Sequence, residues 1–336
     1  MEGEYPVYGA AGYIRNVDFY HQEKPYVAVV KDGAGIGRTM LLPEKSSVIG
    51  TLQYLLPKEN VLPEYLYYVV KNMHLEKYFT GATIPHIYFK DYQNEEFILA
   101  KNGEQREIVA TLKKIEKVIE YKMQEIELLE TLIKARFVEM FGDININDKN
   151  WICEPLGALC TIVRGGSPRP IEQFLGGDVP WIKIGDATDG ENIYLRSTKE
   201  HIIREGVKKS RLVKSGSLIF ANCGVSLGFA RIITFDGCIH DGWLAMEDID
   251  ERLDKVFLLQ ALNQMTDHFR AIAPAGTQPN LNTAIMKTYK QIIPPIELQR
   301  KFIQFTEQVD KSKAAIQKSL EETQLLFDSL MQKYFG

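Results

Sequence analysis

The sequence predicts an α+β (mixed α/β) fold with an internal duplication, in which two globular domains are separated by two long coiled-coil helices, either orientation of which is possible by length alone. Three observations predict it. The chain repeats its pattern at an interval of 194 residues, each copy ends in a helical pattern of about forty residues, and short apolar runs bounded by glycine and aspartate precede each helix. A chain of 336 residues also exceeds one ordinary core, so two domains are expected.

The repeat is clearest just before the long helices, where "ATIPHIY" (82–88) corresponds to "GTQPNLN" (276–282). At the same interval, the "MFG" that ends the first copy corresponds to the "YFG" that ends the chain. Further upstream, "YVAVVKDGAGIGR" (26–38) resembles "GSLIFANCGVSLGFAR" (216–231) at an interval of 191. Both of these segments read as a strand followed by a glycine-rich turn.

The repeats divide the chain into five segments. We predict a first globular domain (1–100), a first helix (101–142), a polar linker (143–150), a second globular domain (151–294) and a second helix (295–336). At an interval of 191, the counterpart of Trp151 would lie about forty residues before Met1. We therefore expect the first domain to lack about forty residues of β-rich structure at its N-terminal side.

Each long helix carries apolar residues at alternating spacings of four and three, the heptad pattern of a coiled coil. These seam residues are Ile108, Leu112, Ile115, Ile119, Ile126, Leu129, Ile133 and Met140 in the first helix, and Phe302, Val309, Ile316, Leu320, Phe327, Leu330 and Tyr334 in the second. The seams are interrupted at Lys122, Arg136, Thr306, Lys313 and Thr323. A helix of about 38 residues would be roughly 57 Å long and would outreach a domain of this size. We therefore expect the helices to pack on each other, the alternative being that each packs on its own domain.

The globular parts read mainly as strands. Runs of alternating or apolar residues predict strands within 179–187, 215–223 and 229–237. A single helix is expected in each copy, at 63–79 and 253–272.

Composition excludes several classes of protein. The net charge of −4 rules out a chain that is basic throughout, so any anion-binding surface must be local. The start of the chain lacks the regions of a signal peptide, and no apolar run could span a bilayer, so a cytoplasmic protein without membrane contact is expected. The four cysteines show no metal-binding spacing and are expected to be free thiols.

Each motif that could indicate catalysis lacks the residues or the neighbouring structure that the catalytic site would need. The glycine-rich loop has Arg38 where a dinucleotide loop needs its last glycine, and no helix pattern follows it. Ile293 and Ile296 flank a double proline where an adenine methyltransferase needs a polar residue and an aromatic one. The one near pair of histidine and carboxylate, His240 and Asp241, is expected to be structural. We predict no catalytic residues, no bound metal and no cofactor.

One segment is strongly basic within a neutral domain. Residues 196–214 hold seven basic and two acidic side chains, whereas 151–294 hold sixteen of each. Local positive charge is what phosphate contact requires, and the amides and hydroxyl of 277–280 could read base edges. The alternatives are a solvated basic face and a capped turn. The predicted DNA contacts are Arg164, Ser167, Arg169, Lys183, Lys208, Lys209, Arg211, Lys214, Asn222, Thr277, Gln278 and Asn280 in the second copy, and Lys31, Arg38, Thr83 and His86 in the first.

Several motifs occur in a characteristic order. "GTQPNL" and "IPPIELQ" precede a long helix, "GGSPRP" and "GGDVPWIKIGD" open the second copy, and "YPVYGAAG" (5–12) stands near the start of the first. Together with the duplicated order of domain and helix, these motifs resemble the specificity subunit of a type I restriction–modification system. The resemblance covers essentially all of the chain.

The resemblance implies that each globular part is a target recognition domain that reads one half of a bipartite double-stranded DNA site. The antiparallel helices would fix the spacing between the halves. Implied partners are two methyltransferase subunits, which bind S-adenosylmethionine and flip adenine, and a separate ATP-driven restriction subunit. His86 and Ile84 stand where the second copy has Asn280 and Gln278, so the first copy would read different bases or read DNA poorly.

Two other kinds of function stay open. The chain could be a half-specificity DNA-binding protein that acts alone or homodimerises through its helices, or a silent recombination cassette. It could also be an enzyme with an unrecognised nuclease or transferase centre, for which Asp178, Asp186 and Asp189 would be candidates. No Glu-x-Lys nuclease pattern accompanies these carboxylates, so they are expected to be loop residues.

Overall fold

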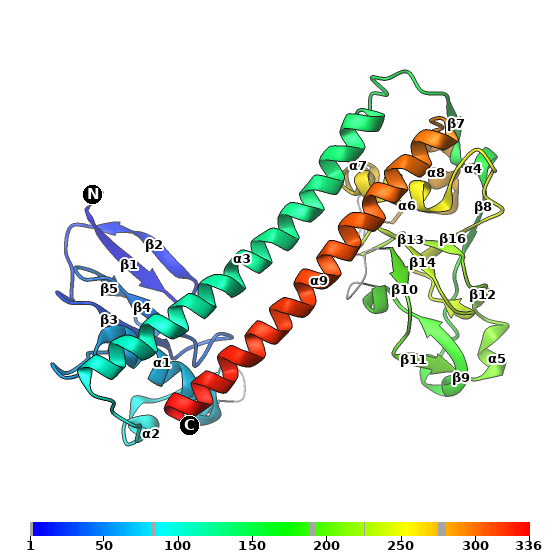
Figure 1. Cartoon of the computed structure of the whole chain (residues 1–336). Helices are drawn as coiled ribbons and strands as arrows, with labels where there is room; N and C mark the ends of the chain where they lie inside the picture. Colours follow the sequence, from blue (N-terminus) through cyan, green and yellow to red (C-terminus); the bar gives the residue numbers. More distant parts are fainter. Residues whose placement is uncertain (1–2, 82–84, 188–192, 225, 275–279) are drawn as a thin grey trace. The chain divides into compact units, whose positions relative to one another are not determined.

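The computed structural model describes residues 3–81, 85–187, 193–224, 226–274 and 280–336 (Figure 1). The chain divides into two compact units, which we call unit 1 (1–127 and 314–336) and unit 2 (128–313). Each unit contains a globular part and a portion of two 40-residue helices, α3 (Asn102–Phe141) and α9 (Ile296–Phe335).

Among its described residues, the globular part of unit 1 has short strands and short helical segments. These are β1 (Tyr5–Gly9), β2 (Gly12–Val17), β3 (Tyr26–Val30), β4 (Thr39–Leu42), β5 (Ser47–Val48), β6 (Leu52–Leu55), α1 (Pro63–Asn72), η1 (Leu75–Tyr78) and α2 (Phe89–Tyr92). The strands form two sheets, ordered β2-β1-β5 and β4-β3-β6. Strand β3, which reads "YVAVV", is buried along its whole length, as expected for an apolar, β-branched run.

The globular part of unit 2 is larger. Its described elements are β7 (Cys153–Pro155), α4 (Leu156–Leu159), β8 (Thr161–Arg164), η2 (Ile171–Gln173), β9 (Leu175–Ile182), η3 (Ile184–Ala187), β10 (Tyr194–Leu195), β11 (Glu200–Ile202), α5 (Arg204–Val207), β12 (Arg211–Val213), β13 (Leu218–Ala221), β14 (Ala230–Ile233), β15 (Gly237–Ile239), β16 (Trp243–Glu247), α6 (Lys255–Gln264), α7 (Thr266–Ile272), α8 (Thr283–Thr288) and β17 (Lys290–Ile292). Three sheets result, ordered β10-β14-β13-β16-β8, β11-β9-β15-β12 and β17-β7.

The five-stranded sheet of unit 2 lies between two cores. Successive residues of a strand point to opposite faces. Leu218 and Phe220 of β13 accordingly pack in one core with α6 and α7, whereas Ile219 and Ala221 pack in the other with the four-stranded sheet. The predicted strands within 215–223 and 229–237 and the predicted helix at 253–272 meet in this arrangement.

The central strands of the two units have the same pairing register. Val29 of β3 lies opposite Thr39 of β4, and Phe220 of β13 lies opposite Ala230 of β14. Both members of the second pair come 191 residues later, and the pairings of β3 with β6 and of β13 with β16 keep the same interval. Gly33 and Gly37 after β3, and the equivalent Gly224 and Gly228 after β13, have positive φ, which explains why both turns use glycine at these positions. The predicted duplication is therefore a duplication of structure.

The outer strands show where the units differ. Val7 of β1 lies opposite Ser47 of β5, as Trp181 of β9 lies opposite Cys238 of β15. The first residues of these pairs are 174 apart and the second residues 191 apart, so unit 2 has 17 more residues between the equivalent strands. Strands β7 and β8 and helix α4 have no counterpart among the described residues of unit 1. The predicted shortening at the N-terminal side stays a prediction, but part of the size difference is internal.

A buried glutamine near the start of each long helix ties that helix to its globular part. Gln105 Oε1 accepts a hydrogen bond from the backbone N–H of Leu62 at 2.9 Å, and its Nε2 donates to the carbonyls of Asn60 and Ala100. Gln299 makes the equivalent three hydrogen bonds in unit 2. The match between these two glutamines in the sequence thus has a structural cause.

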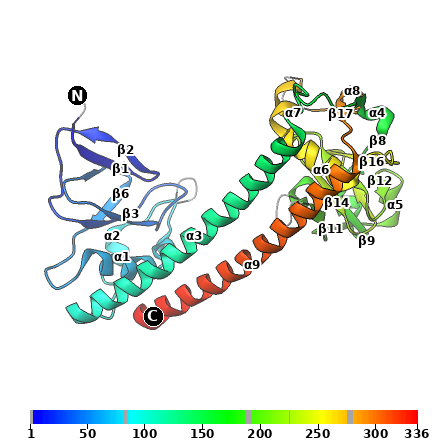
Figure 2. The same cartoon turned by 45° about the horizontal axis from the view of Figure 1, so that its top comes forward.

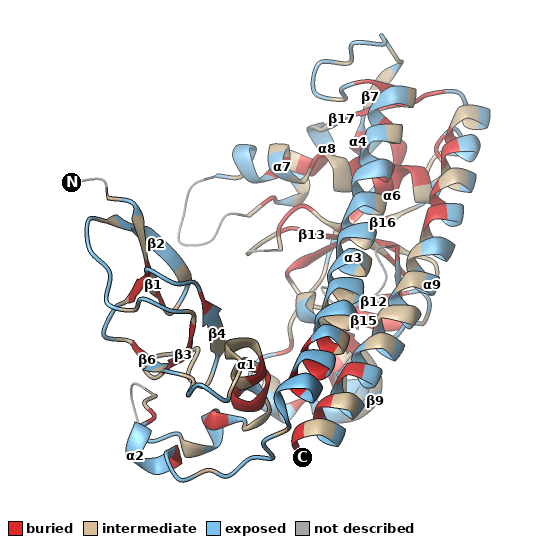
Figure 3. Ribbon diagram, turned by 60° about the vertical axis from the view of Figure 1, so that its left-hand side comes forward, coloured by how far each residue is buried: buried red, intermediate tan, exposed pale blue. Residues whose placement is uncertain are grey.

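Helices α3 and α9 pack antiparallel (Figure 2). In unit 1, Leu112 of α3 shares a core with Phe327 and Met331 near the end of α9. In unit 2, Phe137 near the end of α3 shares a core with Phe302 near the start of α9. Every predicted seam residue is buried or half-buried, and Figure 3 shows buried and exposed positions alternating along both helices. The predicted packing of the helices on each other is confirmed.

Two of the polar residues that interrupt the seams, Lys122 and Lys313, find partners on the facing helix. Lys122 Nζ donates to Thr323 Oγ1 and to Ser319 O, both at 2.9 Å. Lys313 pairs with Glu130 at 2.8 Å. Because a half-buried charge needs such partners, these contacts help to fix which residues lie opposite each other.

The structure corrects one prediction about local structure. The helices predicted at 63–79 and 253–272 are each broken into two segments, α1 and η1 in unit 1 and α6 and α7 in unit 2. His74, between α1 and η1, has a φ of 50°. The turn after β3 packs tightly against η1, since a Cβ atom on Gly37 would lie 2.7 Å from the backbone nitrogen of Glu76. Tertiary packing therefore ends the first helix early.

Candidate nucleic-acid interface

Polar groups of unit 2 gather where strands β8, β13 and β15 end. We call this region the loop end, consisting of residues 164–170, 222–224 and 240–242. Strand β16 begins here and pairs with both β8 and β13, which brings their carboxyl ends together. Three backbone hydrogen bonds join the segments: Gly165 N to Trp243 O at 2.9 Å, Gly166 N to Ile239 O at 3.0 Å, and Asn222 N to Gly242 O at 2.9 Å.

Asp241 links three of the predicted DNA contacts. Arg164 Nε donates to its carbonyl at 3.0 Å, and Ser167 Oγ donates to its Oδ1 at 2.7 Å. Arg169 Nη2 lies 3.6 Å from Oδ2, with its side chain 80% exposed. Asp241 therefore orients Arg164 through its backbone carbonyl and Ser167 and Arg169 through its carboxylate, while the Arg169 guanidinium still faces solvent.

His240 has a contact at each of its ring nitrogens. Its Nδ1 accepts a hydrogen bond from Gly242 N at 2.9 Å, and its Nε2 lies 2.9 Å from Asp241 Oδ1. Burial lowers the pKa of His240, and the nearby charges of Lys183, Arg169 and Arg164 lower it further, against the opposing effect of Asp241. Burial alone would raise the pKa of Asp241, but the Ser167 hydrogen bond and the neighbouring positive charges hold it below its usual value. Lysine and arginine side chains therefore surround this pair with positive charge.

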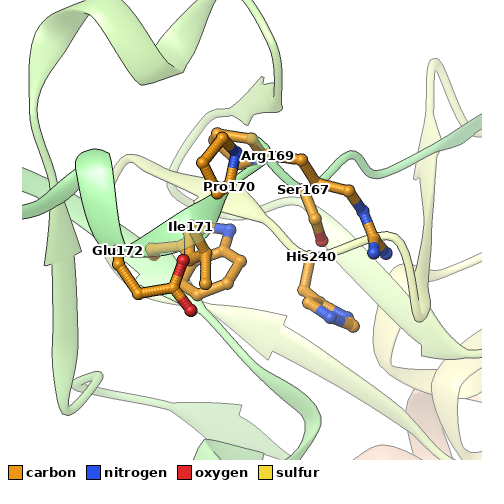
Figure 4. Close-up of a pocket in the computed structure, with 8 residues that line it drawn as sticks. Ser167, Arg169, Pro170, Ile171, Glu172 and His240 are labelled. Carbon is orange, nitrogen blue, oxygen red and sulfur yellow. The ribbon is translucent and has the colours of Figure 1, made fainter.

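A cavity of about 490 Å³ opens beside this cluster. Figure 4 shows Ser167, Arg169 and His240 on one side of it and Ile171 and Glu172 on the other. Its remaining lining comes from three further residues, Pro168, Pro170 and Trp181. The lining thus combines apolar side chains with one cation, Arg169, and one carboxylate, Glu172. The apolar side chains and Arg169 suit contact with a nucleotide, whose base is flat and whose phosphate is anionic.

Asn222 and Asn280 meet in the interior of the loop end. Asn222 is fully buried, and its Nδ2 donates to Asn280 Oδ1 at 3.4 Å. Leu281 N donates to Asn222 O at 2.8 Å, and Cys223 and Asn280 form a β-bridge. Among the described residues, no hydrogen-bond partner is found for the buried Oδ1 of Asn222.

The basic segment lies only partly at this site. Ser210 Oγ donates to Gly166 O at 2.7 Å, which places Lys209 and Arg211 beside the loop end. Lys209 Nζ lies 4.7 Å from the ring centroid of Phe174. Lys208, in the turn after α5, is exposed next to Lys209.

Two predicted contacts are held in ion pairs. Lys214 pairs with Asp236 at 2.7 Å, beyond the opposite end of β12 from Arg211. Lys183 pairs with Glu200 and lies over the ring of Trp181, which lines the cavity. The structure therefore brings together Arg164, Ser167, Arg169, Lys183, Lys208, Lys209, Arg211, Asn222 and Asn280.

In unit 1 the equivalent positions hold different side chains. Asp32 and His86 form a β-bridge equivalent to that of Cys223 and Asn280. The His86 Nδ1 contacts Asp32 Oδ1, and the His86 ring lies 4.1 Å from that of Tyr88. Lys31, which corresponds to Asn222, is half-buried next to this pair.

The fourth predicted contact in unit 1, Arg38, is exposed, and its guanidinium donates to the Ala10 carbonyl. Thr83, Thr277 and Gln278 lie outside the described residues. From the sequence, His240 and Asp241 were expected to be structural and were not predicted to lie at this site. Ser167 and Asp241 lie 74 positions apart in the sequence, and sheet pairing, which no local sequence motif indicates, brings them together.

The described residues give no sign of a catalytic centre of the kinds considered. Asp178 pairs with Arg204 at 2.9 Å, and Asp186 accepts hydrogen bonds from Lys183 N and Thr198 Oγ1 at 2.8 Å; Asp189 lies outside the described residues. In the part of the chain that is described, no group of three or more His, Cys, Asp or Glu residues could hold a metal ion. The same part contains no helix long and apolar enough to cross a membrane.

Comparison with known protein families shows to which family the chain belongs. The family described as "Type I restriction modification DNA specificity domain" matches twice, over residues 1–131 and 141–324. The chain belongs to this family. It is a DNA specificity subunit of a type I restriction–modification system and is not itself the catalytic subunit.

Individual proteins that are similar to this chain also come from type I restriction–modification systems. The chain is 24% identical over 306 residues to the type I restriction enzyme MjaIX specificity subunit of Methanocaldococcus jannaschii, covering 83% of this chain and 69% of the relative. The S subunit of the type I system from M. genitalium is similar over 100% of this chain and 89% of that one, with 19% identity and a TM-score of 0.55. A chain from a study of complex assembly and conformational transition in a type I system has 16% identity, 99% and 92% coverage and a TM-score of 0.65. These structures confirm the predicted fold class.

Proposed function

We propose that each globular part reads one half of a bipartite DNA site and that the paired helices fix the distance between the two halves. The duplicated register of the central strands supports this proposal most directly. It places the residues after β3 and after β13 in equivalent loops, so one chain carries two versions of the same surface. A rigid connection between two readers converts protein geometry into base-pair spacing, as dimer geometry does in other DNA-binding proteins.

The two surfaces carry different chemistry, which suits two different half-sites. Unit 2 presents the half-buried amide of Asn280, backed by the buried amide of Asn222 and flanked by arginines. Unit 1 presents Lys31 and the pair of Asp32 and His86 at the equivalent positions. Amides can donate to and accept from adenine edges, whereas a lysine favours guanine and a carboxylate favours cytosine. Different half-sites are therefore expected for the two units.

The outer faces of the helices support binding of methyltransferase subunits. Although the seam is buried between α3 and α9, several large apolar side chains on the two helices are exposed to solvent. These are Val118, Tyr121, Met123, Leu128, Leu132, Val138, Leu325 and Leu326. Exposed apolar side chains grouped on an element mark protein–protein contact sites. We infer that two methyltransferase subunits bind these faces and that a restriction subunit joins the complex.

The DNA-binding part of this proposal can be tested with a matched pair of substitutions on strand β12. Arg211→Ala, beside the loop end, should weaken DNA binding by the methyltransferase complex and lower the salt dependence by about 0.9 per lost phosphate contact. Lys214→Ala, at the other end of the same strand, should leave both unchanged because Lys214 pairs with Asp236. Equal effects of the two substitutions would contradict the assignment of the loop end as the DNA contact surface.

One alternative has an observation in its favour. Unit 1 lacks counterparts of β7, α4 and β8 among its described residues, and its equivalent surface has fewer basic groups. A chain that reads DNA only through unit 2 would work as a half-specificity protein that homodimerises, or would serve as a recombination cassette. The methylated sequence distinguishes these cases, because two copies of one reader produce a symmetric motif.

A further inference from the structure

One histidine of unit 1 is fixed on both sides of its backbone. His86 forms a β-bridge with Asp32 on one side and with Thr80 on the other. Its N–H and its carbonyl exchange two hydrogen bonds of 2.9 Å with the backbone of Thr80, and the Thr80 hydroxyl donates to the same carbonyl at 3.0 Å. The next residue is held as well, because Ile87 N donates to Lys31 O at 3.0 Å. The backbone at His86 is therefore positioned by the fold itself.

The side chain of His86 is also oriented, and part of it faces solvent. Its Nδ1 contacts Asp32 Oδ1, and its ring centroid lies 4.1 Å from that of Tyr88. The side chains of His86 and Asp32 are 25% and 32% exposed. Among the described residues, no hydrogen bond is found for the other ring nitrogen, Nε2. A partly exposed imidazole in a fixed orientation can present one nitrogen to a ligand.

Unit 2 builds the same backbone without this histidine–carboxylate pair. Cys223 and Asn280 form the equivalent β-bridge. The position of Tyr88 is taken in unit 2 by Asn282, whose side chain caps α8 by accepting a backbone hydrogen bond at 2.9 Å. Tyr88 stands at the start of α2 and makes no such capping bond within the described part of the chain. The shared fold therefore requires neither the pair nor the ring beside it, which points to a role at the surface of unit 1.

The carboxylate of Asp32 determines which ring nitrogen of His86 carries the proton. An ionised carboxylate only accepts hydrogen bonds, so Nδ1 donates to it. In a neutral imidazole with its proton on Nδ1, Nε2 is an acceptor and has no proton to donate. The amide of Asn280, at the equivalent position of unit 2, can both donate and accept. Unit 1 thus offers an acceptor alone where unit 2 offers a donor beside an acceptor.

We propose that His86 is a specificity-determining residue that accepts a hydrogen bond from the N4 amino group of a cytosine, and that Asp32 is its positioning residue. This inference rests on the proposed function of unit 1 as a reader of one half-site. In the major groove, cytosine presents a single donor, adenine presents a donor beside an acceptor, and guanine and thymine present acceptors without an amino group. A lone acceptor next to a carboxylate matches cytosine, whereas an amide matches adenine.

The first test uses the complex of the full chain with the methyltransferase subunit and a library of DNA sites randomised in both half-sites. We expect the wild type to prefer cytosine about tenfold or more at one position of the half-site read by unit 1. His86→Asn should fold, because Asn280 forms the same bridge in unit 2, and should change that preference towards adenine without altering the other half-site. His74→Asn is the matched control. It makes the same substitution at an exposed histidine that lies 3.2 Å from Glu76, and it should leave the motif unchanged.

The second test needs no DNA. Nitrogen NMR of the full chain labelled with ¹⁵N-histidine, at pH 8, should show the His86 ring neutral and protonated at Nδ1, and His86→Asn identifies these signals by removing them. Asp32→Cys introduces the residue that unit 2 has in the equivalent bridge, so the variant should fold. It should shift the His86 proton towards Nε2 and weaken the cytosine preference in the same DNA library.

The outcomes separate this inference from the proposed function. If His86→Asn leaves a split motif unchanged, or alters a position that is not cytosine, the role of His86 is overturned while the reading of two half-sites stands. A wild-type His86 ring protonated at Nε2, or at both nitrogens, would overturn the role of Asp32. A palindromic wild-type motif would overturn the inference together with the proposed function.

Discussion

Gln299 offers a sharp test of how each long helix is joined to its globular part. Its Oε1 accepts from Asp254 N at 2.8 Å, and its Nε2 donates to the carbonyls of Arg252 and Pro294 at 2.8 and 2.7 Å. The side chain is fully buried. Gln299→Ala leaves one N–H and two carbonyls without their partner, and each such group costs about 1–3 kcal/mol when buried. Since two of the three are partly accessible to water, we expect a total loss of about 3 kcal/mol.

The measurement is thermal and urea unfolding of the full chain, with hydrogen exchange to show which unit is affected. For a unit of this size, about 3 kcal/mol corresponds to a fall in Tm of roughly 6–12 °C. Gln299→Glu keeps the shape but places an acceptor opposite two carbonyls, so it should cost at least as much. Arg300→Ala is the matched control, because Arg300 is exposed and pairs with Glu297 one turn earlier. A loss below about 1 kcal/mol for Gln299→Ala, or a harmless Gln299→Glu, would refute this reasoning.

Three further predictions concern single side chains. Burial gives His240 a lower pKa in the folded chain than in the unfolded one, so the unfolded chain binds more protons. The free energy of unfolding should therefore fall as the pH drops below about 6.5. In urea titrations, His240→Asn should flatten that pH dependence. Burial raises the pKa of Cys160 to about 12. Iodoacetamide at pH 8 should therefore label the half-buried Cys153 well before Cys160. Equal labelling of the two cysteines, measured by mass spectrometry, would contradict the packing of α4. Lys122→Ala removes hydrogen bonds to Ser319 and Thr323 and should cost about 1–2 kcal/mol, whereas Lys114→Ala on the exposed face should be neutral in the same unfolding assay.

The helices and the duplication were predictable from the sequence because both are periodic signals. A heptad seam shows which face of a helix is buried without any knowledge of the rest of the fold. The interval of 191 between the glycine turns turned out to be the register interval of the central sheets, since those turns fix where each strand ends. Even so, the aromatic cluster of Phe137 and Phe141 lay outside the predicted seam, because these residues pack against Phe257 of the globular part as well as against α9.

The candidate site was predictable only in part. Arg164, Ser167 and Arg169 stand on one loop, and their residue types indicated anion contact. Asp241, which orients all three, comes from a turn far along the chain, and only sheet pairing brings it there. Lys214 and Arg211 belong to the same basic segment of the sequence. In the structure a short strand separates their side chains, and Lys214 pairs with Asp236.

The central claim, that one chain reads two half-sites across a fixed gap, is tested most directly by the methylated sequence. The chain would be produced with the methyltransferase subunit of its own system in a host that lacks DNA methylation, and modified adenines would be mapped by single-molecule sequencing. The account predicts one split motif with two different halves and a constant unspecified spacer. A palindromic motif would contradict it, because two copies of unit 2 would then be reading the DNA while unit 1 reads none.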